Sequence, residues 1–207
     1  MKPSMEEKKR LKRDRIFRAA SKIFSEKGYF ETTVADIAKE AGVSFGTVFT
    51  YFETKEMLYE TVILEQLEEI KPHFLDIKGT FTGDPMEIIT AMVDRHVTIF
   101  SEKSEFLRLV QQVLARLDRY QALFEELDGF VSDFIESVSP VLEEGQKVGV
   151  FYPDPPDLLA HSYMSTLNGM RLTYIDAPSN HRLWEALKIQ AIRLFGPYHR
   201  TDGPLKW

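Results

Sequence analysis

Apolar residues recur every three or four positions along most of the chain, which is the spacing that one face of an α-helix requires. No stretch alternates apolar and polar residues over the length of a β-strand. The pattern therefore predicts an all-α fold, with residues 1–7 frayed and residues 78–84 in a loop. We expect about nine helices, over residues 8–27, 34–41, 45–52, 54–77, 85–101, 105–117, 120–146, 156–177 and 180–195.

Two short helical patterns flank a tight turn at residues 41–43. Thr33 precedes the first as an N-cap residue, with Asp36 three positions later in the arrangement of a capping box. Gly42 follows its last residue, where a left-handed backbone closes many helices. Ser44 is placed to cap the second helix. This arrangement predicts a helix-turn-helix whose second helix enters the major groove of DNA.

The second helix has two different faces when its residues are placed at intervals of about 100°. One face is apolar, and we expect it to pack against the domain. Its members are Phe45, Val48, Phe49 and Phe52. The opposite face is small and polar, and its hydroxyl groups suit phosphates and base edges. Its members are Gly46, Thr47, Thr50 and Tyr51.

These residues match a known signature. The pattern Thr33-x3-Ile37-Ala38-x2-Ala41-Gly42-Val43-Ser44-x-Gly46-Thr47-Val48-x2-Tyr51-Phe52-x2-Lys55-x2-Leu58 resembles the DNA-binding signature of the tetracycline-repressor (TetR) family. The match has no gap between Thr33 and Leu58. This chain departs from the family in having Phe45 where Lys or Arg is frequent, Phe49 where Tyr is usual, and Thr50 where His is frequent. These departures concern the operator sequence and the affinity rather than the fold.

The resemblance implies contacts with a double-stranded DNA operator from the turn, the second helix and the start of the next. At that start, Lys55 and the helix N–H groups are placed to share a phosphate. The residues expected at the DNA are Thr33, Ser44, Phe45, Gly46, Thr47, Phe49, Thr50, Tyr51 and Lys55.

The charge distribution agrees with this interpretation. The net charge is −6, but residues 1–55 carry 12 Lys or Arg against 8 Asp or Glu, a balance of +4. The remaining residues carry 14 basic against 24 acidic side chains, a balance of −10. A basic head on an acidic body favours DNA binding through the head. With no cysteine, no apolar leader segment and no stretch suited to span a bilayer, we expect a cytoplasmic protein without a membrane partner.

Nothing in the sequence indicates an enzyme. The five histidines form no metal-ligand motif, and no glycine-rich loop matches a nucleotide-binding fingerprint, so we predict neither catalysis nor a cofactor nor a metal. Apolar side chains with a few polar ones on the middle helices suggest instead a pocket for a small-molecule effector, as the family resemblance also implies. The alternative is that they simply fill the core. The candidates are Met92, His96, Phe100, Phe106, Leu109, Gln112, Val113, Tyr120, Phe124, Phe134, Met164 and Asn168.

The last two helices are amphipathic, and four such helices from two chains can form an isologous dimer interface. The family resemblance implies the same homodimer, although the two helices can also pack within one chain. The candidate residues are Ser162, Thr166, Met170, Tyr174, Leu183, Trp184, Leu187, Ala191 and Leu194.

Together these features predict a DNA-binding domain over residues 1–53 and a ligand-binding and dimerisation domain over residues 54–207. The expected function is that of a transcriptional repressor released from a palindromic operator by a small apolar or amphipathic effector. Two alternatives stay open at this point. One is a helical small-molecule-binding protein or enzyme whose helix-turn-helix has lost its DNA function. The other is a module that binds protein through an exposed patch at Phe45 and Phe49.

Overall fold

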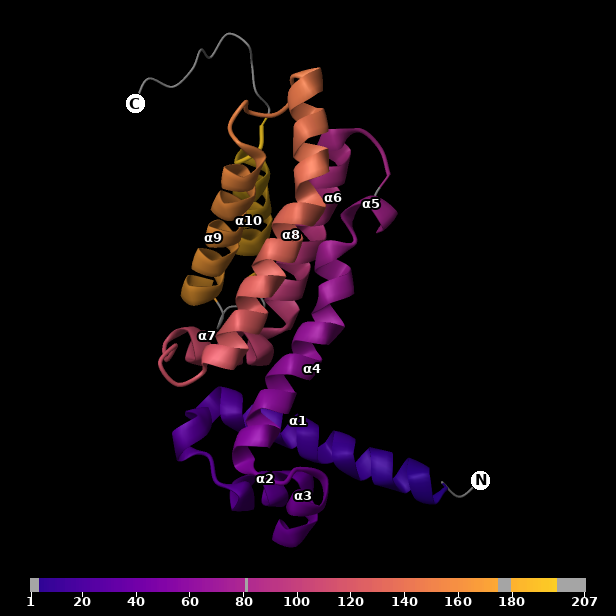
Figure 1. Cartoon of the computed structure of the whole chain (residues 1–207), viewed down its shortest axis with the longest axis vertical. Helices are drawn as coiled ribbons and strands as arrows, with labels where there is room; N and C mark the ends of the chain where they lie inside the picture. The colour runs from indigo at the N-terminus through magenta and orange to yellow at the C-terminus, as the bar shows by residue number, and fades with distance from the viewer. Residues whose placement is uncertain (1–3, 81, 175–179, 197–207) are drawn as a thin grey trace. The chain divides into compact units, whose positions relative to one another are not determined.

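A computed structural model describes residues 4–80, 82–174 and 180–196, apart from the side chains of Lys78, Thr80, Arg171 and Tyr174. The regular structure of these residues is entirely α-helical (Figure 1), which confirms the predicted fold class. The helices are α1 (Met5–Glu31), α2 (Val34–Ala41), α3 (Phe45–Tyr51), α4 (Lys55–Leu75), α5 (Ile77–Thr80), α6 (Pro85–Glu102), α7 (Ser104–Leu114), α8 (Gln121–Val148), α9 (Pro156–Tyr174) and α10 (His181–Arg193).

The first helix starts earlier and ends later than expected. Ser4 accepts a hydrogen bond from the backbone N–H of Glu7, and the Glu7 carboxylate accepts one from the backbone N–H of Ser4. This capping box starts α1 at Met5, so the prediction that residues up to 7 are frayed is wrong from Ser4 onward. Gly28, the residue after the expected helix end at 27, interrupts the helix with a φ of 79°, but helical structure resumes as far as Glu31.

The connection between α4 and α6 is more ordered than the predicted loop. α4 continues past Pro72 and ends three residues later. The single turn α5 follows, and the carboxylate of Asp76, the residue before it, accepts a hydrogen bond from the backbone N–H of Gly79 at 3.0 Å. Asp84 then caps α6, and Pro85 occupies its first position, where the predicted helix over residues 85–101 was expected to begin.

The chain divides into two compact units. Unit 1 comprises the residues up to Glu68 together with Glu105–Leu123, and unit 2 comprises Glu69–Ser104 together with the residues from Phe124 onward. Unit 1 therefore contains α1, α2, α3, most of α4, α7 from Glu105 onward and the first residues of α8. The functional boundary expected after residue 53 stays a prediction, since compactness divides the chain elsewhere.

Unit 1 has an apolar core built from α1, α2 and the first half of α4. Phe24 is fully buried, and its ring meets the edge of Tyr59 at a centroid distance of 5.0 Å. Gln112 of α7 donates a hydrogen bond to the backbone carbonyl of Phe24 at 2.9 Å and accepts one from the Tyr59 hydroxyl at 3.2 Å. Burial raises the pKa of Tyr59, which keeps its hydroxyl neutral and able to donate. These contacts fasten α7 to α1 and α4 within the unit.

Unit 2 has a core of stacked rings. The His96 imidazole lies parallel to the Phe74 ring at a centroid distance of 3.7 Å, and its Nδ1 lies 3.0 Å from the Tyr163 hydroxyl. At the surface, Lys188 of α10 forms an ion pair with Asp94 of α6 at 2.5 Å. The unit is thus closed by packing of α6 against α4, α9 and α10.

Candidate nucleic-acid interface

The turn between α2 and α3 has the geometry that its residues predict. Thr33 and Asp36 form a capping box at the start of α2. Gly42 closes α2 with a φ of 62°, and a Cβ at this position would lie 2.7 Å from a nitrogen of Arg15. The Arg15 guanidinium donates hydrogen bonds to the carbonyls of Ala41 and Gly42. α1 therefore holds the turn directly, and the helix-turn-helix is confirmed.

α3 is anchored at both ends and seated by few side chains. Ser44 Oγ accepts a hydrogen bond from the Thr47 backbone N–H at 3.3 Å and lies 2.7 Å from the Thr47 hydroxyl. Val48 and Phe52 are buried, and the Phe52 N–H donates to the Val48 carbonyl. Thr50 uses its hydroxyl to donate to the carbonyl of Gly46 at 3.2 Å. Val48 within α3 and Phe52 directly after it therefore connect this helix to the core of unit 1.

The expectation that Phe45 and Phe49 pack against the domain is wrong. Phe45 is 55 % exposed and Phe49 is 39 % exposed. Their rings contact each other in a T-shaped arrangement, with a centroid distance of 5.1 Å. The outer face of α3 is therefore aromatic along one side and carries small and hydroxyl-bearing residues along the other.

Lys55 lies at the start of α4 as predicted, but its ammonium group points back to the end of α1. It donates hydrogen bonds to the carbonyls of Tyr29 at 2.8 Å and Thr32 at 2.9 Å, and it lies 4.3 Å from the centre of the Tyr29 ring. Two of its three donors are thus used within unit 1. This geometry suits a residue that positions the reading helix better than one that binds a phosphate.

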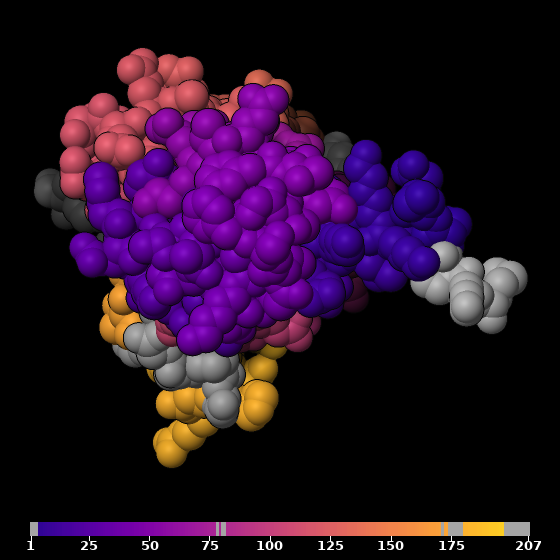
Figure 2. All heavy atoms as spheres, turned by 90° about the horizontal axis from the view of Figure 1, so that it is seen from below, coloured from indigo at the N-terminus to yellow at the C-terminus, as the bar shows by residue number. Residues whose placement is uncertain are grey.

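A groove of about 500 Å³ runs between the first turns of α1 and the end of α3. The end of unit 1 that carries α2 and α3 faces the viewer in Figure 2, and the first turns of α1 extend to one side of it. The groove is basic with an apolar component, a combination that suits a sugar–phosphate backbone. Its lining residues are Met5, Lys8, Lys9, Leu11, Lys12, Arg15, Thr50 and Tyr51. The basic run at residues 8–13 is the sequence signal for it.

The other residues expected at the DNA lie where contact is possible. Thr33, Ser44, Gly46 and Thr50 are exposed, and Thr47 and Tyr51 are partly exposed. The hydroxyls of Thr33 and Ser44 also serve as helix caps.

The residues predicted to form an effector pocket fall into two groups. Unit 1 contains Phe106, Leu109, Gln112, Val113 and Tyr120; unit 2 contains Met92, His96, Phe100, Phe124, Phe134, Met164 and Asn168. Gln112 is committed to hydrogen bonds inside unit 1, as described above. His96 is fully buried between rings, and burial lowers its pKa to about 3, against a partial rise from the backbone of Phe74. His96 therefore has the surroundings of a neutral core histidine.

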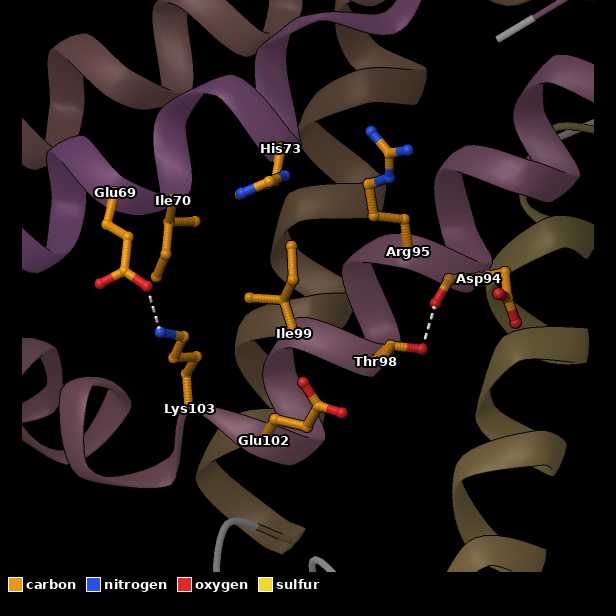
Figure 3. Close-up of a pocket in the computed structure, with 9 residues that line it drawn as sticks. All are labelled: Glu69, Ile70, His73, Asp94, Arg95, Thr98, Ile99, Glu102 and Lys103. Atoms are coloured by element: carbon orange, nitrogen blue, oxygen red, sulfur yellow. Dashed lines mark hydrogen bonds and ion pairs between the residues drawn. The ribbon is translucent and has the colours of Figure 1, made fainter. Parts of the chain in front are cut away.

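Unit 2 has a cleft of about 450 Å³ between the end of α4 and α6, outside the predicted pocket set. Figure 3 shows Ile70 and Ile99 pointing into the space between the two helices. Glu69 and Lys103 form an ion pair at 2.7 Å that joins the helices at one end. The remaining lining residues are His73, Asp94, Arg95, Thr98 and Glu102. An apolar floor with charged walls suits an amphipathic small molecule.

The predicted dimer-interface residues differ in exposure. Met170, Trp184 and Ala191 are buried within the single chain, whereas Ser162 is exposed and Thr166, Leu183, Leu187 and Leu194 are partly exposed. The side chain of Tyr174 lies outside the described residues. Leu158, Leu172 and Ile189 are further exposed apolar residues of α9 and α10 that the sequence pattern did not single out.

Within the described helices, none combines the length and the apolar character needed to cross a membrane. The described residues also hold no cluster of three or more His, Asp or Glu side chains that could bind a metal ion.

Comparison with known proteins gives consistent results. A sequence profile described as "Bacterial regulatory proteins, tetR family" matches residues 16–62. The transcriptional repressor KstR2 of Mycolicibacterium smegmatis is 27% identical over 151 residues, which cover 69% of each chain. The fatty acid metabolism regulator protein of Bacillus subtilis is 28% identical over 142 residues, 68% of this chain and 71% of that protein. The structure of the ketosteroid transcriptional regulator KstR2 of Mycobacterium tuberculosis shares the fold, with a TM-score of 0.71 at 20% identity over 89% of this chain and 94% of the other.

Unit 1 has the features of a helix-turn-helix DNA-binding protein. It has an anchored turn, a short exposed helix after that turn and a lysine-lined groove beside the helix. Residues 16–62 match the TetR-family profile, and the relatives and the shared fold support placing the chain, within this class, among TetR-type transcriptional regulators.

Proposed function

We propose that this regulator is a dimeric repressor that binds a palindromic operator and is released from it by a small apolar or amphipathic effector. The observation that carries the DNA-reading part is the exposed outer face of α3 beside the lysine-lined groove of α1. In a dimer, two such faces read half-sites separated by about one helical turn of DNA or a multiple of it.

The contacts divide into two kinds. Lys8, Lys9 and Lys12 provide positive charge at the groove and bind the sugar–phosphate backbone, with Tyr51 contributing its hydroxyl. The outer residues of α3 face the base edges. Lys55 acts indirectly, because its hydrogen bonds to the end of α1 fix the start of α4 behind the reading helix.

The effector part rests on the relatives and on α4. One relative is named a repressor and another a fatty acid metabolism regulator, which favours negative regulation and an effector with an apolar carbon chain. α4 contributes residues to both units and lines the cleft of unit 2 with Ile70 and His73. An effector that prefers one position of α4 shifts the population toward that state, and DNA affinity falls by no more than that preference.

The test is selection of bound sequences from random duplex DNA at two salt concentrations, followed by titration of the selected duplex with each variant. Wild-type protein should enrich a palindrome and lose affinity steeply as salt rises. Lys12→Ala should lower the slope of log affinity against log salt by about 0.9, the value for one phosphate contact. Lys55→Met should lower affinity without changing that slope.

Lys147→Ala is the matched control, since Lys147 is an exposed lysine of α8 in unit 2. It should bind like the wild-type protein. A medium-chain or long-chain fatty acid added to the same titration should weaken binding if the effector class is right. Absence of any enriched sequence at low salt would reject the proposed function, and a slope change in Lys55→Met would assign Lys55 to a phosphate after all.

A further inference from the structure

The aromatic pair on α3, Phe45 and Phe49, is exposed rather than part of the buried core of unit 1. Val48 and Phe52 already seat the helix, whereas Phe45 and Phe49 leave much of their ring surface in water. Exposed apolar surface of this size costs free energy of hydration unless a partner covers it. The rings of Phe45 and Phe49 also contact each other, with their centroids 5.1 Å apart, so they form one continuous apolar edge.

Two neighbouring features indicate which partner covers this edge. Gly46 lies beside Phe45, and a Cβ built there would meet no heavy atom within 4 Å, so the helix backbone is open to a close approach from outside. Thr50 follows Phe49 and lines the lysine-rich groove, so the aromatic edge adjoins a surface suited to an anionic backbone. An apolar protein partner has no need of those lysines, whereas duplex DNA matches both features.

In the major groove, one base offers an apolar group. Thymine exposes its C5-methyl, and phenylalanine is among the side chains that contact it, while the other base edges there present hydrogen-bond donors and acceptors. A phenyl ring makes no hydrogen bond in exchange for desolvating those polar edges. Two adjoining rings therefore favour thymine at the base pairs that they reach.

We propose that Phe45 and Phe49 are specificity-determining residues that read thymine methyl groups in the operator. This inference rests on the proposed function, because it requires α3 to lie in the major groove. It makes these two residues, whose positions hold Lys or Arg and Tyr in many members of the resembled family, the source of this regulator's own sequence preference.

The test replaces thymines in the selected duplex with deoxyuridine, one position at a time, which removes the methyl group and leaves the Watson–Crick edge unchanged. Wild-type protein should lose about fourfold in affinity at each thymine that a ring contacts, the factor expected for burial of one methyl group. Phe45→Ala and Phe49→Ala should bind the thymine duplex more weakly and should each be insensitive to deoxyuridine at the position that the missing ring reads.

Phe30→Ala is the control for removal of an exposed ring in the same unit, because Phe30 is 56 % exposed and lies on α1 rather than on α3. It should retain the sensitivity to deoxyuridine. Equal binding of thymine and deoxyuridine duplexes by the wild-type protein would overturn the inference while leaving the proposed function intact. Weaker binding by the Phe variants with unchanged sensitivity to deoxyuridine would also overturn it, since the rings would then contact sugar or another group.

Discussion

Gly46 lies in the seven-residue helix α3 without the positive φ that would require a glycine. The space around it is also open, so alanine fits the folded protein at this position. Gly46→Ala should therefore raise the free energy of unfolding by about 0.5–1 kcal/mol, because alanine costs less backbone entropy in a helix. It should lower DNA affinity roughly tenfold, because the added methyl keeps α3 from the groove. Thermal unfolding and a DNA titration on the same sample measure both effects.

Opposite signs in these two measurements distinguish a ligand-facing glycine from a structural one. If Gly46→Ala binds the selected duplex as tightly as the wild-type protein, the backbone of α3 does not approach DNA at this point. If it lowers the free energy of unfolding, the residue has a role within unit 1 that its open surroundings do not reveal.

Residue roles on α3 were only partly predictable from the sequence. A helical wheel placed Phe45 and Phe49 with the buried Val48, because the three lie within one arc of a helix too short to define its buried side. Lys55 was correctly located at a helix start, but its partners are carbonyls of Tyr29 and Thr32. Those carbonyls come near it only once α1 and α4 are packed, and no local pattern in the sequence indicates that.

At the scale of single helices, α8 offers two glycines in contrasting surroundings. A Cβ at Gly145 would lie 2.0 Å from the Phe151 ring, whereas one at Gly129 would meet no heavy atom within 4 Å. Gly145→Ala should lower the free energy of unfolding by about 1–3 kcal/mol, because the buried Phe151 ring must move. Gly129→Ala, the same change in the same helix, should raise it by about 0.5–1 kcal/mol. Urea unfolding of the two variants beside the wild-type protein measures both.

A destabilised Gly129→Ala would mean that alanine is unfavourable in α8 for a reason other than packing. A neutral Gly145→Ala would show that the turn after α8 yields easily to the added methyl, and that Phe151 is not fixed by the contact.

Helix ends were predictable wherever the signal was local. Thr33 and Gly42 each act within four residues, and both have the predicted cap geometry. Ser4 and Glu7 have the spacing of a capping box in the sequence, but residues 1–7 were predicted to be frayed. In the turn α5, the Asp76 side chain accepts a hydrogen bond from the backbone N–H of Gly79. This local interaction was missed because the two glycines of residues 78–84 led to the prediction of a loop.

At the scale of the whole molecule, the division of α7 and α8 between two units could not be predicted. The apolar faces of Phe106 and Phe134 look alike in sequence, yet one lies in unit 1 and the other in unit 2. Periodicity shows that a face is buried and does not show against what. The predicted pocket set therefore mixed core residues of both units, and the effector site stays a proposal.

His96 makes the stability of unit 2 depend on pH. Its ordinary pKa of 6.5 falls to about 3 in the folded protein because the ring is fully buried. The unfolded chain therefore takes up a proton below about pH 6.5 that the folded chain excludes, so stability is lost as the pH falls from there toward 3. Lowering the pH from 7 to 5 should cost about 2 kcal/mol of unfolding free energy through this residue alone.

The reference is the double variant His96→Phe with Tyr163→Phe, which removes both polar groups of the buried pair and leaves no unpaired partner. The two proteins differ only at this buried pair, so the difference between their urea unfolding free energies isolates His96. As the pH falls from 7 to 5, the unfolding free energy of the wild-type protein should decrease relative to that of the double variant. A difference that stays constant with pH would mean that His96 reaches a proton in the folded state, which requires unit 2 to open around the Phe74 stack.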